Sequence, residues 1–181
     1  LAGGKSTRMG FDKQLLKINE RSLIESLKKK LKKEFNEIIV VTNKSEYYIG
    51  STDKIIKDKI PGKGPLSGIH AGLVEASSHY VYFVACDMPN IYLDYIRFMK
   101  KEIRGLKVKA CITKFGQWIE PFNAFYSKDM ILDIENHLSQ DKRSVNSLIK
   151  KLNVHYIEEA KAREFSPNWD MFLNLNTKEE L

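Results

Sequence analysis

Apolar residues occur along the chain in two patterns: at helical spacing, and in unbroken runs. Between Ser22 and Phe35 they return every three or four positions, with Ser22 and Glu25 placed as a capping box, which predicts an amphipathic helix. From Tyr80 to Cys86 they are almost uninterrupted, which is typical of a strand in the middle of a parallel sheet covered on both faces. The chain therefore combines helices with buried strands.

Segments of these two kinds alternate along the whole chain. The predicted helices cover 22–35, 66–76, 92–104, 128–138 and 145–152, and the predicted strands cover 38–42, 54–57, 80–86, 108–113, 122–126, 154–157 and 171–175. This order predicts an α/β fold: a single doubly wound, Rossmann-like domain over residues 1–181, with a mostly parallel sheet, helices on both faces and ligands at the carboxyl ends of the strands. A length of 181 residues suits one such domain.

Charge and composition narrow the classes of partner. A net charge of +7 favours anionic partners without choosing among them. The lysines from Lys28 to Lys33 fall mainly on the outer face of the first predicted helix, without interleaved aromatic residues, so they indicate a solvated surface rather than a nucleic-acid site. No apolar run approaches the ~20 residues of a membrane span, and we expect neither an anchor nor a leader. Cys86 and Cys111 lie in separate apolar runs, which suits a reducing, cytoplasmic compartment.

Groups that bind phosphate are concentrated between Leu1 and Lys13. This span holds three glycines, of which Gly3 and Gly4 adjoin, together with two hydroxyls and three cations. Glycines let consecutive backbone N–H groups approach a phosphate, and Arg8 and Lys13 can neutralise its charge, so we expect a triphosphate to bind here. The spacing matches neither the Walker loop nor the dinucleotide fingerprint. Because such a loop normally follows a strand, we expect a short segment with most of that strand to precede Leu1.

Polar residues that follow other predicted strands complete the candidate site. Asp87 comes directly after the apolar strand, and Mg²⁺ commonly takes one or two carboxylates plus phosphate oxygens, so Asp87 is expected to hold this metal; a helix cap or a turn is an equal alternative. Asp58 precedes a glycine-rich segment and is a natural acceptor for the N1–H and N2–H₂ edge of guanine. Asn43 ends its own strand, where it can contact the same nucleotide.

Taken together, these segments resemble the molybdenum cofactor guanylyltransferases, a family of Rossmann-like nucleotidyltransferases. The motifs that carry the resemblance are Leu1-Ala2-Gly3-Gly4, Arg8-Met9-Gly10, Asp12-Lys13, Gly64-Pro65-Leu66-Ser67-Gly68-Ile69, Cys86-Asp87-Met88-Pro89, Glu120-Pro121 and Phe172-Leu173-Asn174-Leu175-Asn176-Thr177. The opening motif indicates a nucleotidyltransferase in general. Its combination with the later motifs indicates the guanylyl enzyme.

The resemblance implies transfer of GMP from GTP to the terminal phosphate of molybdopterin, or of its molybdenum-loaded form, with release of pyrophosphate. We expect GTP to bind in residues 1–100 and the acceptor in residues 101–181. The residues implied are Leu1, Ala2, Gly3, Gly4, Lys13, Asn43, Asp58 and Asp87 for GTP, Arg8, Lys13 and Asp87 for catalysis, Asp87 for Mg²⁺, and Glu120, Arg143, Asn174 and Asn176 for the acceptor. An asparagine at a strand end also often only satisfies turn backbone. Transient contact with proteins that handle the cofactor is compatible with this function.

Three other functions stay open from the sequence. They are a related CTP or sugar-phosphate nucleotidyltransferase, including the cytidylyltransferase of the same cofactor, a non-catalytic nucleotide-binding module, and a basic nucleic-acid-binding domain. The joint presence of Arg8, Lys13 and Asp87 disfavours the passive module, which has little use for a metal carboxylate. The four histidines lack the spacing of zinc ligands. For Trp118 and Trp169 we expect packing roles.

Overall fold

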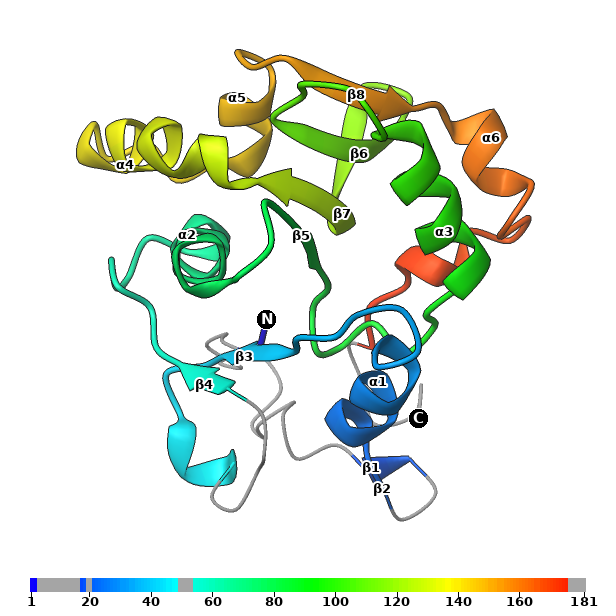
Figure 1. The fold of residues 1–181 in the computed structure, drawn as a ribbon, viewed down its shortest axis with the longest axis horizontal. Helices are drawn as coiled ribbons and strands as arrows, with labels where there is room; N and C mark the ends of the chain where they lie inside the picture. The colour runs from blue at the N-terminus through cyan, green and yellow to red at the C-terminus, as the bar shows by residue number, and fades with distance from the viewer. Residues whose placement is uncertain (3–16, 19–20, 49–53, 176–181) are drawn as a thin grey trace.

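The computed structural model describes residues 1–2, 17–18, 21–48 and 54–175, in which helices and strands alternate much as the sequence pattern predicts (Figure 1). The strands are β1 (Lys17–Ile18), β2 (Arg21–Ser22), β3 (Ile39–Val41), β4 (Lys54–Ile56), β5 (Tyr80–Phe83), β6 (Ala110–Phe115), β7 (Trp118–Ser127) and β8 (Val154–Ile157). The α-helices are α1 (Leu23–Leu31), α2 (Pro65–Glu75), α3 (Leu93–Glu102), α4 (Ile131–Ser139), α5 (Val145–Ile149) and α6 (Glu159–Arg163). Short 3₁₀ turns are η2 (Ser45–Tyr48), η3 (Lys128–Met130) and η4 (Asp170–Phe172).

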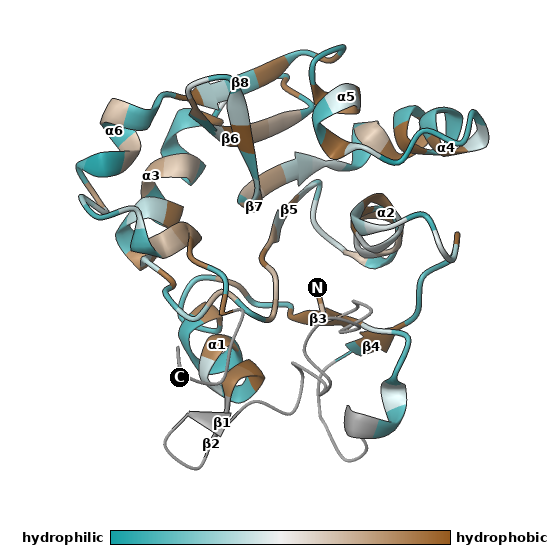
Figure 2. Cartoon of the chain, turned by 180° about the vertical axis from the view of Figure 1, so that it is seen from behind, coloured by the Kyte–Doolittle hydropathy of each residue, from teal (hydrophilic) through white to brown (hydrophobic). Residues whose placement is uncertain are grey.

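Helix α1 is amphipathic, as its apolar spacing predicts. Leu27 and Leu31 are buried, whereas Lys29 and Lys30 on the other side are exposed. Figure 2 shows this helix with hydrophobic and hydrophilic residues side by side, next to the uniformly hydrophobic β3. The lysine run of α1 therefore lies on a solvated surface.

Residues Leu1 and Ala2 connect two parts of the sheet. The Leu1 amino group donates to the Val84 carbonyl, and Cys86 N–H donates to the Leu1 carbonyl at 2.9 Å, which is the alternating pattern of parallel strands. On the other side, Ala2 N–H donates to the Val41 carbonyl at 2.8 Å. With the ladders β3–β4 and β5–β7–β6–β8, the order across the sheet is β4, β3, Leu1–Ala2, β5, β7, β6, β8.

Two helical layers cover the two faces of this sheet. Helices α1, α3 and α6 enclose one core, centred on residues such as Tyr95, and α2, α4 and α5 enclose a second, centred on residues such as Ile69. Neighbouring residues of β6 point into different cores, since Cys111 belongs to the first and Ile112 to the second. The predicted doubly wound arrangement is confirmed.

The sheet is mostly parallel, as predicted, and β7 is its antiparallel member. The β3–β4 and β6–β8 pairs are parallel, but β7 runs antiparallel to both β5 and β6, so the sheet is mixed. Only Gly116 and Gln117 separate β6 from β7, and Gly116 has a φ of 56°. A connection this short makes a hairpin and cannot make the crossover that a parallel pair needs.

The strand predicted over 171–175 is wrong. This segment begins with the 3₁₀ turn η4, and Leu173–Leu175 follow without a ladder partner among the described strands. Local hydrogen bonds favour the turn: Ser166 Oγ accepts from Met171 N–H at 3.2 Å and donates to the Asp170 carboxylate. Side chains of this kind offer the backbone an alternative to a sheet ladder.

Candidate functional site

The carboxyl ends of β4, β3, Leu1–Ala2 and β5 meet at one edge of the sheet, because these segments run parallel. Asp58 follows β4, Asn43 follows β3 and Asp87 follows β5, so three of the predicted residues lie along this edge in the order of the strands. Ligands of doubly wound folds bind at this edge. The structure thus brings together the described part of the predicted nucleotide site.

Asn43 and Asp58 are joined directly. The Asn43 side-chain amide donates to Asp58 Oδ2 at 2.9 Å, and Asp58 N–H donates to Asn43 Oδ1 at 3.3 Å. The two residues therefore form one exposed polar pair across the ends of β3 and β4. A carboxylate fixed in this way keeps further acceptor positions for the donors of a base.

Leu1 and Ala2 begin the segment that the sequence predicts to bind phosphate. Ala2 is buried, and a Cβ placed on Gly68 would lie 3.1 Å from Leu1 Cδ2, so the glycine lets α2 pack closely against Leu1. The predicted contacts Gly3, Gly4, Arg8, Lys13 and Asn176 lie outside the described residues.

The chain near residue 175 is tied to the Asp87 loop. Leu175 N–H donates to the Asp87 carbonyl at 2.8 Å, so the neighbouring, exposed Asn174 lies close to the predicted metal ligand. This contact brings a residue predicted for the acceptor to the residue predicted for the metal.

Asn123 holds the segment around Met171 against β7, and the sequence pattern did not predict this role. It is buried in β7 with a φ of 56°, where the pairing with β6 shifts register between Cys111 and Thr113. Its amide donates to the Met171 carbonyl, and its Oδ1 accepts from the Tyr82 hydroxyl. Asparagine tolerates this left-handed conformation better than most residues, and an asparagine inside an otherwise apolar strand was the available signal.

Glu120 lies on a different strand, near the start of β7. Its Oε1 accepts from Trp169 Nε1–H at 3.2 Å. Burial raises the pKa of the Glu120 carboxyl, and the hydrogen bond from Trp169 opposes that shift. Trp169 is packed against aromatic rings as predicted, but the side chain of Trp118 is 70% exposed, so a packing role for Trp118 is wrong.

Arg143 contacts the loop before α2 rather than the other acceptor candidates. Its guanidinium lies 3.0 Å from Asp141 Oδ1 and donates to the Gly62 carbonyl at 3.4 Å. Lys63 Nζ reaches the same Asp141 oxygen at 2.6 Å. Arg143 is therefore not brought beside Glu120 by any of its described contacts.

A cavity of about 350 Å³ is lined by β3, by β5, by Leu1 and by the segment that joins α1 to β3. The described residues that line it include Val41, Phe83, Glu34 and Glu37 but neither lysine nor arginine. An apolar space with two acids does not suit a triphosphate. The cavity is therefore not the nucleotide site.

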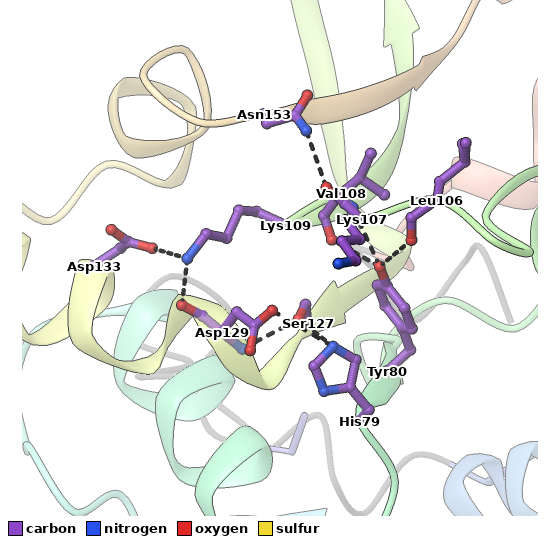
Figure 3. Close-up of polar contacts among 10 residues, drawn as sticks. All are labelled: His79, Tyr80, Leu106, Lys107, Val108, Lys109, Ser127, Asp129, Asp133 and Asn153. Carbon is purple, nitrogen blue, oxygen red and sulfur yellow. Dashed lines mark hydrogen bonds and ion pairs between the residues drawn. The ribbon is translucent and has the colours of Figure 1, made fainter.

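A polar cluster at the opposite edge of the sheet resembles a catalytic triad only in composition (Figure 3). Ser127 Oγ lies 3.1 Å from His79 Nε2, and Asp129 Oδ2 lies 3.6 Å from the same nitrogen. A nucleophilic triad needs the acid on the other ring nitrogen. Ser127 Oγ also accepts from Asp129 N–H at 3.1 Å, so it caps η3.

The described residues also bear on metal binding and on membrane insertion. Among residues 1–2, 17–18, 21–48 and 54–175, no three His, Cys, Asp or Glu side chains gather as a protein-only metal site requires. The half-buried Asp87, at the strand edge, fits a site of the other kind, in which Mg²⁺ takes one carboxylate and phosphate oxygens. No helix within the described ranges is both long and apolar enough to cross a membrane.

Known proteins are similar to this chain in sequence and in fold. The family of MobA-like NTP transferase domains matches residues 1–156. Over the whole chain, 55% of residues are identical to the probable molybdenum cofactor guanylyltransferase of Peptoclostridium acidaminophilum, 84% of which is covered. The molybdenum cofactor guanylyltransferase of Syntrophotalea carbinolica is 52% identical over 99% of this chain and 86% of its own length.

A solved structure agrees with these sequence relatives. The crystal structure of molybdopterin-guanine dinucleotide biosynthesis protein A from Archaeoglobus fulgidus superimposes with a TM-score of 0.84 at 27% identity, covering 99% of this chain and 91% of that protein. The fold and the sequence identity over the full length indicate the same family. The chain belongs to the MobA-like NTP transferase family, and within it to the molybdenum cofactor guanylyltransferases.

Proposed function

We propose that this chain transfers GMP from GTP to the terminal phosphate of molybdopterin, releasing pyrophosphate and forming the guanine dinucleotide of the cofactor. The observation that carries the proposal is the strand order, which places the Asn43–Asp58 pair, Leu1–Ala2 and Asp87 in succession along one edge. Relatives at 52% and 55% identity that are named for this activity support it.

The proposed roles follow this order. Asn43 and Asp58 bind the guanine or ribose. The segment from Leu1 to Gly4 contacts the nucleotide, and the backbone N–H groups of Gly3 and Gly4 are the proposed phosphate donors, because the Leu1 and Ala2 nitrogens already donate within the sheet. Lys13 and Arg8 neutralise charge that develops on the α-phosphate and the leaving pyrophosphate. Asp87 would hold Mg²⁺, which would supply positive charge to neutralise the phosphates.

The reaction needs positioning more than acid–base chemistry. The attacking phosphate is largely ionised at neutral pH if its second pKa is about 6, as in phosphorylated side chains, so no general base is required. Asn174, held near Asp87 through Leu175, is proposed to orient the acceptor, together with Asn176. No covalent enzyme intermediate is needed, because alignment of the two phosphates and charge neutralisation provide the rate enhancement.

The proposed compartment is the cytoplasm. Neither Cys86 nor Cys111 forms a disulfide with a described residue, and burial raises the pKa of the Cys111 thiol to about 12, which keeps it unreactive. Transient contact with proteins that supply the pterin belongs to the same proposal.

Pyrophosphate release tests the proposed function. GTP, CTP, UTP and ATP are each supplied with Mg²⁺, with and without molybdopterin. We expect release only from GTP with molybdopterin present. Equal release from CTP would indicate a cytidylyl enzyme, and nucleotide binding without any release would indicate a non-catalytic module.

A further inference from the structure

The β6–β7 hairpin carries an acid and aromatic rings on one face of the sheet. Trp118 and Glu120 are two residues apart in β7, and Phe115 of β6 is the cross-strand partner of Trp118, so the three side chains share a face. Trp169 covers part of this face: its ring centroid lies 5.1 Å from that of Phe115, and its Nε1–H donates to Glu120.

The Glu120 carboxylate is incompletely paired. Within the described ranges, Trp169 is the single group that hydrogen-bonds this side chain. The Arg163 guanidinium lies 4.9 Å from the Trp169 ring, but its ion pair is with Glu159 at 2.7 Å. A half-buried carboxylate with one neutral donor is costly to keep, and such groups occur where a ligand completes the pairing.

Trp118 is the aromatic group available for stacking. Its side chain is 70% exposed, and none of the ring or cation contacts between described residues involves it. By contrast, Trp169 is enclosed by Phe115, Phe172 and Arg163. A flat ligand would therefore meet the face of Trp118 and the carboxylate of Glu120 together.

We propose that Trp118 and Glu120 bind the pterin ring of the acceptor. Trp118 stacks on the ring, and Glu120 accepts hydrogen bonds from the 2-amino group and the adjacent ring N–H, two donors that lie side by side as a carboxylate requires. The identity of the acceptor rests on the proposed function. The inference adds the place where its ring binds.

Guanine presents the same pair of donors, and the strand order separates the two ligands. Of the residues of β7, only 124–127 pair with β5, so the end of β7 formed by residues 118–123 extends past β5. From the Leu1–Ala2 segment, β7 is two strands away, about 10 Å at ordinary strand spacing, on the side opposite the Asn43–Asp58 pair. The base and the pterin then lie on opposite sides of Leu1–Ala2 and Asp87, where the phosphates meet.

Tryptophan fluorescence tests this site without turnover, because both tryptophans of the chain lie there. The probe is 6-hydroxymethylpterin, titrated into the 181-residue protein. We expect Glu120→Gln and Trp118→Ala each to raise its Kd by about tenfold, whereas Trp118→Phe, which keeps a stacking ring, stays near the parent. Glu158→Gln, an exposed acid just after the neighbouring β8, is the matched control and leaves the Kd unchanged.

Kinetics separate this inference from the proposed function. Glu120→Gln is expected to raise KM for molybdopterin by about tenfold with KM for GTP unchanged. An unchanged pterin Kd in both Glu120→Gln and Trp118→Ala, or a rise in KM for GTP instead, would overturn the pterin site. If the parent binds the pterin as expected but releases no pyrophosphate with GTP and molybdopterin, the proposed function fails while the site stands.

Discussion

The two edges of the central sheet use similar residues in opposite ways. At the amino ends of β5, β6 and β8, polar side chains bind the backbone nearby (Figure 3): the Tyr80 hydroxyl donates to the Val108 carbonyl at 2.8 Å, and Asn153 donates to the Lys107 carbonyl at 3.0 Å. Lys109 contacts both the Asp129 carbonyl at 2.6 Å and Asp133 at 3.0 Å.

At the carboxyl edge, pairing is less complete. The Glu120 carboxylate has one neutral donor, and the Asn43–Asp58 pair is open to solvent. Residue type does not separate the two edges, because each has acids, amides and aromatic rings. Glu120 and Asp58 differ from Asp133 of the other edge in lacking a lysine partner among their described contacts, which suits the edge where we propose that a ligand binds.

Matched acid-to-amide changes at the two edges should give the largest contrast. Asp87→Asn removes the charge proposed to hold Mg²⁺, and we expect kcat for guanylyl transfer to fall by about 100-fold or more, equivalent to ~2.7 kcal/mol. Asp133→Asn at the opposite edge should retain the parental rate. Steady-state pyrophosphate release measures both, with circular dichroism to verify the folds. A near-parental rate for Asp87→Asn would remove the metal role from this edge.

Asn123 tests a place where the carboxyl edge is as fully paired as the other. Asn123→Ala leaves the Met171 carbonyl and the Tyr82 hydroxyl without this partner, so we expect the free energy of unfolding to fall by about 2 kcal/mol. Urea titration monitored by fluorescence gives the value. Asn153→Ala, which removes one exposed hydrogen bond, should cost less than about 1 kcal/mol. Equal losses would contradict a special role for Asn123.

The Asp58 carboxylate can be examined with two nucleotides that differ at one group. ITP lacks the 2-amino group of GTP, so a carboxylate that accepts from this group should favour GTP. We expect Asp58→Asn to weaken GTP binding by about tenfold and ITP binding by less. Isothermal titration of each nucleotide into the protein, without molybdopterin so that no transfer occurs, measures both affinities. If both nucleotides lose affinity equally, Asp58 acts on the ribose or on Asn43 alone.

Glu120→Gln should show the smallest effect of these substitutions, and it should stabilise the protein at pH 7 instead of destabilising it. Since burial raises the pKa of Glu120 in the folded protein, its contribution to stability is present below the unfolded pKa and is lost as pH rises through the folded pKa. Glu120→Gln should therefore raise stability at pH 7, by less than about 1 kcal/mol, and the gain should vanish near pH 4. Thermal melts across this range measure it. A loss of stability at pH 7 would show that Glu120 is already well paired.

Much of the fold follows from the spacing of apolar residues, because a helix or strand that is buried on one side repeats its apolar positions with the period of that element. The apolar run at residues 80–86 and the amphipathic pattern of α1 were sufficient to place a buried strand and a surface helix. The hairpin that reverses β7 depends on a turn of two residues, and the turn η4 depends on Ser166 and Asp170 side chains. Such local hydrogen bonds compete with apolar spacing and are harder to infer from it.

The candidate site was predictable where one residue follows one strand. Asp87, Asn43 and Asp58 each follow a recognisable strand, so their shared edge could be expected. Trp118 and Asn123 could not be assigned in the same way. The role of Trp118 depends on which face of β7 is left uncovered, and that of Asn123 depends on a distant segment, since Met171 approaches it only in the folded chain.

The hairpin between β6 and β7 has a consequence for divergence within this fold. It carries Phe115, Trp118 and Glu120, where we propose that the acceptor binds, yet it is one continuous stretch of sequence that contains none of the residues proposed to bind the nucleotide. Substitutions there can change which acceptor is received while the triphosphate chemistry is inherited intact. If the acceptor binds there as proposed, exchanging this short segment between relatives should change the phosphate to which GMP is attached.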